Sequence, residues 1–410
     1  MRRTAEDVSW WGEELVARQP APAAWAVSGR VVTYGQLRLQ VTGLRGLFAA
    51  HGIRPGSTVA LRGMQSFSQL WSILALWSLG AQVLLIDPEI RGDELVGLLD
   101  GCRPQFFIAF GSPPPRRGQF RDECEILVKR LRAGRPAATD HVLVQLTSGS
   151  TGRVKAVGRT GRSLRAELDA FRRTGGMPQA ADRVLVVGPM AHSFNLIGGL
   201  LHNMDVGATT VFAGSMSLPS LLRASLRSGV DTVLGTAEQV AQLARGGRAL
   251  RIHTLRRALA GGAPLAPQVH TAFAERHGVR IGQAYGTTET GIIAADPTGW
   301  FGPDTVGMIA PGRQVRLVDG ELQVRLERNP YVDAGASSAA FLPEAAGPAG
   351  WLRTGDLAAF DPDNGGLRIR GRIDPLRERV GVPERAESVL LAARTAGRVL
   401  TAGGWQAHLR

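Results

Sequence analysis

The residues best suited to chemistry lie in one stretch, 142–157, where an apolar segment gives way to hydroxyl and glycine residues. Residues 142–146 are Val-Leu-Val-Gln-Leu, which predicts a short strand, and a Thr-Ser-Gly-Ser-Thr-Gly run follows at 147–152. Lys155 comes next among the charged side chains after Arg153. Glycines let backbone N–H groups approach an anion, hydroxyls add donors, and lysine adds charge. This composition favours a phosphate-binding loop, although such a run is also typical of a flexible linker.

Two further observations bear on this loop. Lys155 is too far from Gly152 for the Gly-x-x-x-x-Gly-Lys-Ser/Thr pattern of nucleoside triphosphatases. The sequence has lysine only at positions 129 and 155 and uses arginine at every other Lys/Arg position. A compact ammonium fits a tight phosphate site better than a wide guanidinium does, which favours a specific use for Lys155, and chance remains the alternative.

Composition narrows the class of protein. A length of 410 residues predicts two or three subdomains, and 44% hydrophobic residues is ordinary for a globular protein. Cys102 and Cys124 are too few for a disulfide framework and lack metal-ligand spacing, which favours a cytoplasmic location. Residues 1–7 show no export signal, and the apolar run at 70–79 is too short to cross a bilayer, so we expect a buried helix there and no membrane partner.

The formal net charge of +13 raises the question of nucleic acid. The basic residues are scattered along the sequence instead of forming a stripe with aromatic residues. We therefore expect no nucleic-acid partner, and an acidic protein partner is the better use of this charge.

Strands alternating with helices predict a mostly parallel, doubly wound α/β protein. Short β-like pieces separated by turns from residue 307 onward predict a smaller β subdomain, and residues 111–138 are expected to be an exposed connection. The expected subdomains are 1–140, 141–306 and 307–374. Expected helices include 34–51, 67–79, 163–173 and 195–204, and expected strands include 59–61, 82–86, 106–110, 183–187, 257–260, 279–282, 314–318, 321–326 and 366–370.

Three more stretches combine glycine with polar side chains. They are Gly-Gly-Ala-Pro at 261–264, Gln-Ala-Tyr-Gly-Thr-Thr-Glu-Thr-Gly at 283–291, and Trp-Leu-Arg-Thr-Gly-Asp-Leu at 351–357, which precedes Gly-Arg-Ile-Asp at 371–374. Each is expected just past the carboxyl end of a strand, where parallel sheets present ligand-binding loops.

Together with the loop at 147–155, these motifs resemble the adenylate-forming superfamily over roughly residues 33–374. That superfamily includes acyl- and aryl-CoA ligases, adenylation domains of nonribosomal peptide synthetases, and luciferase. The resemblance implies a large N-terminal domain made of two doubly wound α/β subdomains plus a small β subdomain. It also implies ATP-dependent activation of a carboxylic acid, whose carboxylate attacks the α-phosphate while pyrophosphate leaves. The acyl group would then pass to CoA or to the phosphopantetheine of a carrier protein.

The resemblance implies a role for each matching position. Lys155 would contact the β- and γ-phosphates together with Thr147, Ser148, Gly149, Ser150, Thr151 and Gly152. Thr288 would bind the α-phosphate, Glu289 would hold Mg²⁺, and these two would form the catalytic set with Lys155. The remaining nucleotide contacts would be Gly262, Ala263 and Pro264 beside the adenine, Tyr285 stacked on it, Gly286 and Thr287 in the same motif, Asp356 on the ribose hydroxyls, and Arg372. Asp374 would be the hinge between the large and small domains.

From the residues alone, other roles stay open. Tyr285 could be core packing, Glu289 a surface or helix-capping acid, and Asp356 an acid that bonds turn amides.

The substrate class is suggested by residues 189–195, Pro-Met-Ala-His-Ser-Phe-Asn. Ser193 occupies the position where amino-acid-activating relatives carry an Asp for the α-ammonium, and an unpaired buried ammonium is costly. We therefore expect an aryl or acyl acid, with His192 either in contact with it or part of the core. The expected pocket is lined by His192, Ser193, Phe194, Gly235, Gly262, Ala284, Gly291 and Ile292.

The match weakens toward the C-terminus. The family carries a catalytic lysine in a C-terminal domain, whereas this sequence has no lysine after Lys155, and residues 375–410 are expected to be a remnant of that domain. Arg377 and Glu378 stand where an apolar residue and a lysine are usual. The chain could be truncated, could be a natural short form that receives the lysine from a partner protein, which we favour, or could bind nucleotide and acyl groups with little catalysis of its own.

Overall fold

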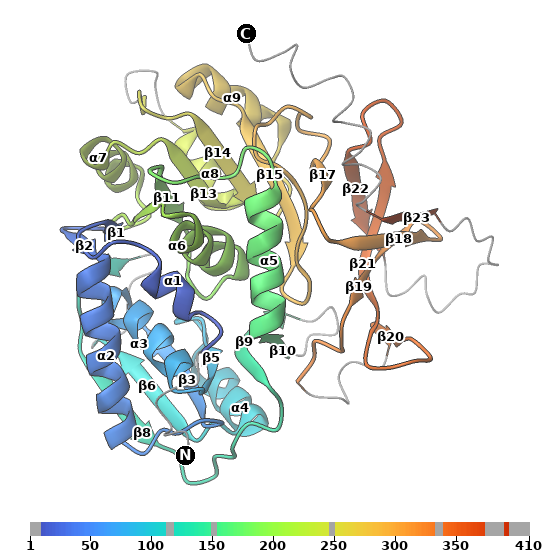
Figure 1. The fold of residues 1–410 in the computed structure, drawn as a ribbon. Coiled ribbons are helices and arrows are strands. Elements are labelled where there is room, and N and C mark those ends of the chain that lie inside the picture. Colours follow the sequence, from blue (N-terminus) through green and yellow to red (C-terminus); the bar gives the residue numbers. More distant parts are fainter. Residues whose placement is uncertain are drawn as a thin grey trace.

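The structure is a computed structural model that describes residues 10–111, 119–148, 154–245, 251–332, 339–373 and 389–392. Two sheets with helices packed on them form the α/β part of the molecule, and a third, antiparallel sheet lies to one side of it (Figure 1). Asp374, Arg377 and Glu378 fall outside the described residues.

The largest sheet has nine strands and carries most of the predicted motifs. Its order is β17-β16-β15-β14-β13-β11-β12-β1-β2, and the strands from β15 to β1 run parallel, so their carboxyl ends share one edge. The bounds are β1 (Ala24–Val27), β2 (Val31–Thr33), β11 (Arg183–Val187), β12 (Thr209–Val211), β13 (Thr232–Thr236), β14 (Arg257–Gly261), β15 (Ile281–Thr287), β16 (Gly291–Asp296) and β17 (Met308–Ile309).

A six-stranded sheet contains the strands of the first half of the chain, in the order β10-β9-β5-β3-β6-β8. These are β3 (Thr58–Gly63), β5 (Gln82–Leu85), β6 (Phe106–Phe110), β8 (Ile126–Arg130), β9 (His141–Ser148) and β10 (Val154–Thr160). The sheets do not divide at residue 140, because β9 pairs with β5 in this sheet while β1 and β2 join the nine-stranded one.

The expectation of an exposed connection at 111–138 is wrong over part of its length. Strand β8 pairs antiparallel with β6, and Ile126 and Val128 pack against the main core. A second short strand, β7 (Phe120–Arg121), pairs with β4 (Gln65–Ser66). The arginine-rich composition of this region reflects an edge strand with one solvated face, which is common in antiparallel pairs.

Helices begin where the sequence supplies caps. Thr33 and Gln36 form a capping box at the start of α2 (Tyr34–Ala50), and Ser66 and Thr160 cap α3 (Phe67–Ser78) and α5 (Gly161–Arg173). Nearly all of α3 is buried, as expected for the run at 70–79. The other helices are α1 (Glu13–Ala17), α4 (Gly92–Cys102), α6 (His202–Val206), α7 (Leu218–Ser228), α8 (Ala237–Leu243) and α9 (Pro267–His277).

The predicted continuous helix at 195–204 is wrong in its geometry. Residues Phe194–Leu201 form a π-helix, η1, which continues into α6. A side chain at Gly198 would crowd Phe171, and one at Gly199 would crowd Val186, so the two glycines let this wider turn pack closely. Wide turns of this kind often occur at functional sites.

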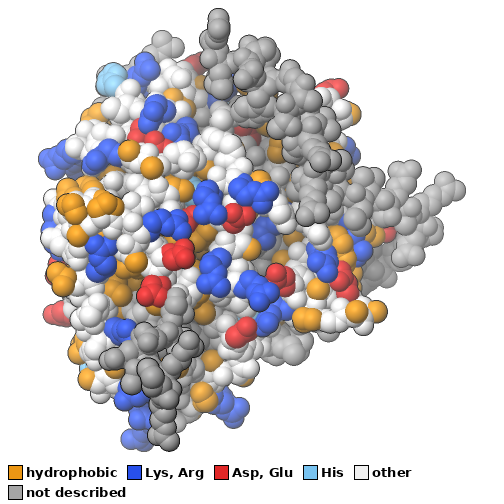
Figure 2. Space-filling model, in the orientation of Figure 1, with side chains coloured by type: hydrophobic (Ala, Val, Ile, Leu, Met, Phe, Trp, Pro, Cys, Tyr) orange, Lys and Arg blue, Asp and Glu red, His pale blue; other side chains and the backbone are white. Residues whose placement is uncertain are grey.

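One large hydrophobic core joins the two α/β sheets. It contains Trp25 from β1, Phe67 from α3 and Val184 from β11, and all three are fully buried. Among the described residues, no helix is both long enough and apolar enough to span a membrane. On the face in Figure 2, arginine and lysine side chains are interspersed with acidic and apolar ones.

The third sheet is antiparallel and contains the β subdomain expected from residue 307 onward. Its strands are β18 (Gln314–Val318), β19 (Glu321–Leu326), β20 (Phe341–Pro343), β21 (Gly350–Phe360), β22 (Leu367–Arg372) and β23 (Val389–Ala392). Strand β23 pairs with β18, so part of the stretch expected to be a domain remnant belongs to this sheet. The 351–357 motif lies inside β21 and not past a parallel strand, because its alternating burial suits a long strand with one covered face.

Candidate active site

The carboxyl ends of four parallel strands, β11, β13, β14 and β15, bring most of the predicted motifs to one edge of the nine-stranded sheet. Gly262, Ala263 and Pro264 directly follow β14, as expected, and Gly262 has φ +86°. The 283–291 motif runs further than expected as a strand, because β15 continues to Thr287. Only residues 288–290 form the turn into β16.

The turn between β15 and β16 is held by its own hydroxyl groups. The Thr287 amide donates to Thr290 Oγ1 at 3.2 Å, and the Thr290 amide donates to Thr287 Oγ1 at 3.3 Å. Side chains at Gly286 or Gly291 would overlap neighbouring atoms, and Gly291 has φ +68°. The glycines and threonines of this motif therefore shape the turn that presents Thr288 and Glu289.

Lys155 lies on a strand and not in the loop where it was expected. Strand β10 pairs antiparallel with β9, with Lys155 opposite Thr147. The loop residues Gly149, Ser150, Thr151 and Gly152 lie outside the described residues, as does the side chain of Ser148. An antiparallel hairpin accounts for the difference, because the backbone resumes its ladder immediately after the glycine-rich segment.

Lys155 and Glu289 lie on the same side of the molecule and meet at Tyr331. The Lys155 ammonium is 5.2 Å from the centre of the Tyr331 ring, and the Tyr331 hydroxyl donates to Glu289 Oε1 at 3.2 Å. Burial and the Glu289 carboxylate both raise the pKa of Tyr331, so its hydroxyl remains a donor at neutral pH. The rare lysine and the expected magnesium ligand therefore face one small region.

Tyr285, Asp356 and Arg372 contact one another. The Tyr285 hydroxyl donates to Asp356 Oδ2 at 2.6 Å, and Arg372 Nε donates to Asp356 Oδ1 at 2.8 Å. Burial and the Asp356 carboxylate raise the pKa of Tyr285. Asp356 raises the pKa of Arg372, with smaller contributions from Tyr285 and Glu289, so this group lies within electrostatic range of the turn carrying Glu289.

Two side-chain hydrogen bonds hold the backbone of the segment 189–195, which carries His192 and Ser193. Gln145 Nε2 donates to the Ala191 carbonyl at 2.7 Å, and Asn195 Nδ2 donates to the Pro189 carbonyl at 3.0 Å. His192 Nδ1 and Ser193 Oγ are buried and have no hydrogen-bond partner in the described structure. Burial lowers the pKa of His192, so the imidazole is neutral at pH 7. Two unpaired, buried polar atoms on adjacent residues suit a polar ligand group.

The other predicted pocket residues fall into two groups, those near His192 and Phe194 or buried in the sheet, and those that pack against other parts of the structure. A side chain at Gly262 would lie 3.1 Å from His192 Nε2, and one at Gly261 would lie 2.9 Å from the Phe194 ring. Ala284 and Ile292 are buried. By contrast, Gly235 lies against the Val187 backbone and Gly291 against the Glu167 carboxylate, so close packing already explains both of these glycines.

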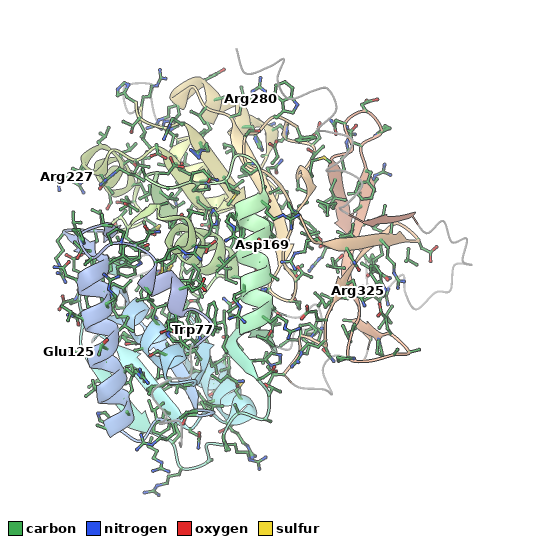
Figure 3. The ribbon with its side chains drawn as sticks, viewed as in Figure 1. Trp77, Glu125, Asp169, Arg227, Arg280 and Arg325 are labelled. Atoms are coloured by element: carbon green, nitrogen blue, oxygen red, sulfur yellow. The ribbon has the colours of Figure 1, made fainter. Side chains whose placement is uncertain are left out.

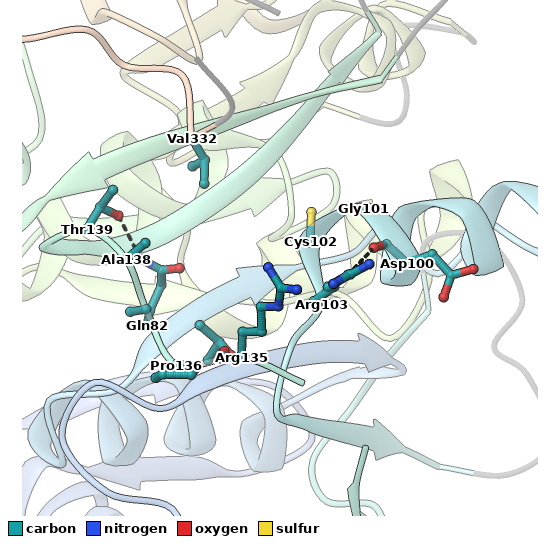
Figure 4. A pocket seen from close by; sticks show the side chains of 12 residues that line it. Gln82, Asp100, Gly101, Cys102, Arg103, Arg135, Pro136, Ala138, Thr139 and Val332 are labelled. Atoms are coloured by element: carbon teal, nitrogen blue, oxygen red, sulfur yellow. Dashed lines mark hydrogen bonds between the residues drawn. The ribbon is translucent and has the colours of Figure 1, made fainter. Parts of the chain in front are cut away.

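None of these residues lines the cavity of about 580 Å³ in Figure 4, although Val332, which follows Tyr331, does. Thr58 and Gln82, which line it, begin β3 and β5, whereas Thr147 lies near the carboxyl end of β9. The exposed side chains of Arg103 and Arg135 are beside it. Ligand sites of parallel sheets form at the carboxyl ends, so we assign no substrate to this cavity.

Sequence reasoning missed four residues at the site, namely Tyr331, Arg159, Glu167 and Arg313. Tyr331 has no motif around it and comes 42 residues after Glu289, to which it donates. Arg159 stands on β10 four positions beyond Lys155, and same-face spacing along a strand was the one signal that could have indicated it.

Metal binding at this site would depend on Glu289. Among the described residues, no three His, Cys, Asp or Glu side chains lie together as a ready-made metal site. Mg²⁺ commonly takes one or two carboxylates plus substrate phosphates and waters, so a single glutamate beside a phosphate site fits this ion.

The comparisons with known proteins agree with this geometry. A family model described as AMP-binding enzyme matches residues 13–330. The chain is 28% identical over 376 residues to an anthranilate–CoA ligase of Pseudomonas aeruginosa, covering 82% of this chain and 71% of that protein. It is 26% identical over 421 residues to a 4-coumarate–CoA ligase-like protein of Oryza sativa subsp. japonica, covering 89% and 75%.

Solved structures show the same fold. The anthranilate CoA ligase AuaEII in complex with anthranoyl-AMP superposes with a TM-score of 0.75 at 20% identity, covering 90% of this chain and 78% of that one. ATP-bound MatB from Rhodopseudomonas palustris superposes with a TM-score of 0.73 at 18% identity, covering 89% and 79%. The chain therefore belongs to the AMP-binding, adenylate-forming enzymes, and it is similar in sequence to members of the acyl- and aryl-CoA ligase kind.

Proposed function

We propose that this protein activates an aryl or medium-sized acyl carboxylic acid as its acyl-adenylate and then passes the acyl group to a thiol. The thiol would belong to CoA or to the phosphopantetheine of a carrier protein. The observation that carries the proposal is the meeting of Lys155 and Glu289 at Tyr331, with Thr288 in the same turn. A cation, a carboxylate suited to Mg²⁺ and a hydroxyl then surround the place where phosphate charge would develop.

The reaction needs little covalent chemistry from the protein. A carboxylate oxygen of the substrate attacks the α-phosphorus, the bond from that phosphorus to the bridging oxygen breaks, and the electron pair leaves with pyrophosphate. Lys155 would offset negative charge on the departing phosphates, and Thr288 would orient the α-phosphate. Mg²⁺, when bound to Glu289 and the phosphates, would supply further charge neutralisation.

The Tyr285–Asp356–Arg372 group would bind the nucleoside. Asp356 is buried and its two oxygens already accept hydrogen bonds from Tyr285 and Arg372, which hold the carboxylate in one orientation. A carboxylate accepts hydrogen bonds from paired ribose hydroxyls, so a fixed orientation favours nucleotide binding.

An aryl acid is the substrate class that the site supports best. His192 Nδ1 and Ser193 Oγ offer unpaired neutral polar atoms, and no carboxylate is among the residues 189–195 to hold an ammonium group. The relatives of this chain include proteins named as anthranilate–CoA ligase, 4-coumarate–CoA ligase-like and 2-succinylbenzoate–CoA ligase. These names support an aromatic or related carboxylic acid for this chain.

The test is ATP–pyrophosphate exchange with Mg-ATP and a panel of aryl and acyl acids. We expect acid-dependent exchange, strongest with an aryl acid. Lys155→Met should lower its rate by about 10²–10³, the cost of a lost transition-state contact. Lys129→Met is the matched control, because Lys129 is the other lysine and lies exposed on the edge strand β8. The proposal would be contradicted if none of the acids in the panel supported exchange, or if both variants lost exchange activity equally.

A second candidate is a nucleotide- and acyl-binding protein that acts through a partner. It is favoured by the absence of any lysine after Lys155 in the sequence. Calorimetry would then show ATP or AMP binding by the chain without turnover, and adding a candidate partner would not restore exchange. Cys102 and Cys124 form no disulfide in the described structure, which supports our proposal that the protein works in the reducing cytoplasm.

A further inference from the structure

Two buried charged side chains, Arg159 and Glu167, contact the backbone on either side of the turn that carries Thr288 and Glu289, and the half-buried Arg313 is close enough to both for them to affect its pKa. Arg159 of β10 and Glu167 of α5 form an ion pair of 2.6 Å, and each side chain is only 3% exposed. Arg313, which follows β17, is electrostatically coupled to both. The helix α5 packs against β10 and β16, so the cluster of these three side chains sits where three elements meet.

The cluster holds the backbone of the turn from two sides. Arg159 Nη1 donates to the Thr288 carbonyl at 3.5 Å, and the Ile292 amide donates to Glu167 Oε1 at 3.0 Å. A side chain at Gly291 would overlap the Glu167 carboxylate, so only glycine permits this close approach. Thr288 and Ile292 thus bracket the turn, and both are tied to charged residues outside it.

The same strand also carries the lysine. Lys155 and Arg159 are four residues apart on β10, which places them on one face of the strand. Lys155 reaches Glu289 through Tyr331, while Arg159 reaches the Thr288 carbonyl directly. Strand β10 therefore fixes the position of Lys155 relative to the turn through two contacts, one by way of Tyr331 and one through Arg159.

The cluster contains two arginines and only one carboxylate, which is unusual for a group of residues that serves only to stabilise the fold. Arg159 forms the ion pair with Glu167, whereas Arg313 feels both charges and its Nε and Nη2 atoms are buried without a hydrogen-bond partner in the described structure. Burial, opposed by Glu167 and aided to a smaller extent by Arg159, lowers the pKa of Arg313 to about 10. Buried ion pairs contribute little net stability, and apolar replacements of similar size often fold as well or better.

We propose that Arg159, Glu167 and Arg313 form a positioning element of the adenylation site, which fixes turn 287–291 so that Thr288 and Glu289 face Lys155. This inference rests on the proposed function for its effect on catalysis. Its structural part, the fixed turn, can be tested without any activity. In Figure 3, Asp169 marks α5 between the α/β part and the β subdomain, where Arg325 is labelled.

The experiment removes all three charges together, as Arg159→Met/Glu167→Met/Arg313→Met, so that no charge is left unpaired. We expect a thermal unfolding midpoint equal to or above that of the wild type. Amide hydrogen exchange of a peptide covering 286–294 should be at least tenfold faster. Pyrophosphate exchange should show a KM for Mg-ATP raised at least tenfold, with the KM for the acid little changed.

Arg257→Met is the matched control, because Arg257 pairs with Asp182 at 2.8 Å at the opposite end of β14 from the site. It removes a partly buried ion pair and should leave both the 286–294 exchange and the KM for Mg-ATP unchanged. If the triple variant does not fold, Arg159→Lys replaces it, since one ammonium keeps the charge but cannot bridge Glu167 and Thr288 as a fork does.

Wild-type protection of the 286–294 amides in the folded variant would overturn the inference, whatever the activity. Faster amide exchange together with an unchanged KM for Mg-ATP would overturn its catalytic part. If none of the acids supports pyrophosphate exchange by the wild type, the proposed function fails. The hydrogen-exchange result still decides whether the cluster fixes the turn.

Discussion

Tyr331→Phe tests the contact on which the site depends. The substitution keeps the aromatic ring under Lys155 and removes only the hydroxyl that donates to Glu289 Oε1 at 3.2 Å. A hydrogen bond to a charged group contributes about 1.5–3 kcal/mol. Glu289 is half-buried, so the lower end of this range applies, and about 1.5 kcal/mol corresponds to roughly a tenfold change in rate.

The assay is pyrophosphate exchange at varied Mg²⁺ and ATP. Glu289 would be less well oriented for the metal in Tyr331→Phe, so we expect kcat/KM for Mg-ATP to fall roughly tenfold and the Mg²⁺ requirement to rise. Tyr331→Leu also removes the ring face that Lys155 contacts, which should cost about a further 0.5–1 kcal/mol.

The chain offers a matched series, because it has three tyrosines. The Tyr34 hydroxyl is buried without a hydrogen-bond partner in the described residues, so Tyr34→Phe should leave exchange unchanged and stability equal or higher. Tyr285→Phe removes the donor to Asp356 and should raise the KM for ATP with little effect on the Mg²⁺ requirement. The reasoning is refuted if Tyr331→Phe behaves like Tyr34→Phe.

Three other predictions concern separate parts of the molecule. Asp356→Asn should raise the KM for ATP at least tenfold, measured by exchange, because the neutral amide loses its ion pair with Arg372 and part of its acceptor capacity. Ser193→Ala should raise the KM for the acid severalfold and leave that for ATP unchanged, which would be wrong if both moved together. Burial lowers the pKa of His202 to about 4 from 6.5, so the folded state keeps this imidazole neutral while the unfolded chain takes up a proton. Stability from His202 is therefore full above pH 6.5 and falls by about 3 kcal/mol as pH drops to 4. Denaturant unfolding at several pH values should show a shallower acid loss in His202→Gln, and an equally steep loss would contradict this assignment.

Local residue patterns were sufficient to predict those helices, strands and loops that are stabilised by residues close to them in the sequence. The strands at 314–318 and 321–326 and the helices after Thr33 and Ser66 follow from turn residues, caps and periodicity. The loop at 262–264, where we expect nucleotide contacts, follows β14 because glycine and proline end a buried strand. The pattern failed at the 351–357 motif, where a strand with one covered face was interpreted as a loop.

The sequence by itself determined the chemistry available to this protein: a rare lysine after a glycine-rich segment, a turn with Thr288 and Glu289, and the membership in an adenylate-forming family that these motifs indicate. Only the tertiary structure decided which side chains hold them. Tyr331 meets Glu289 across 42 positions, and Glu167 meets the Ile292 amide across 125. Such contacts leave no periodic signal, because they arise from the packing of whole strands and helices against one another.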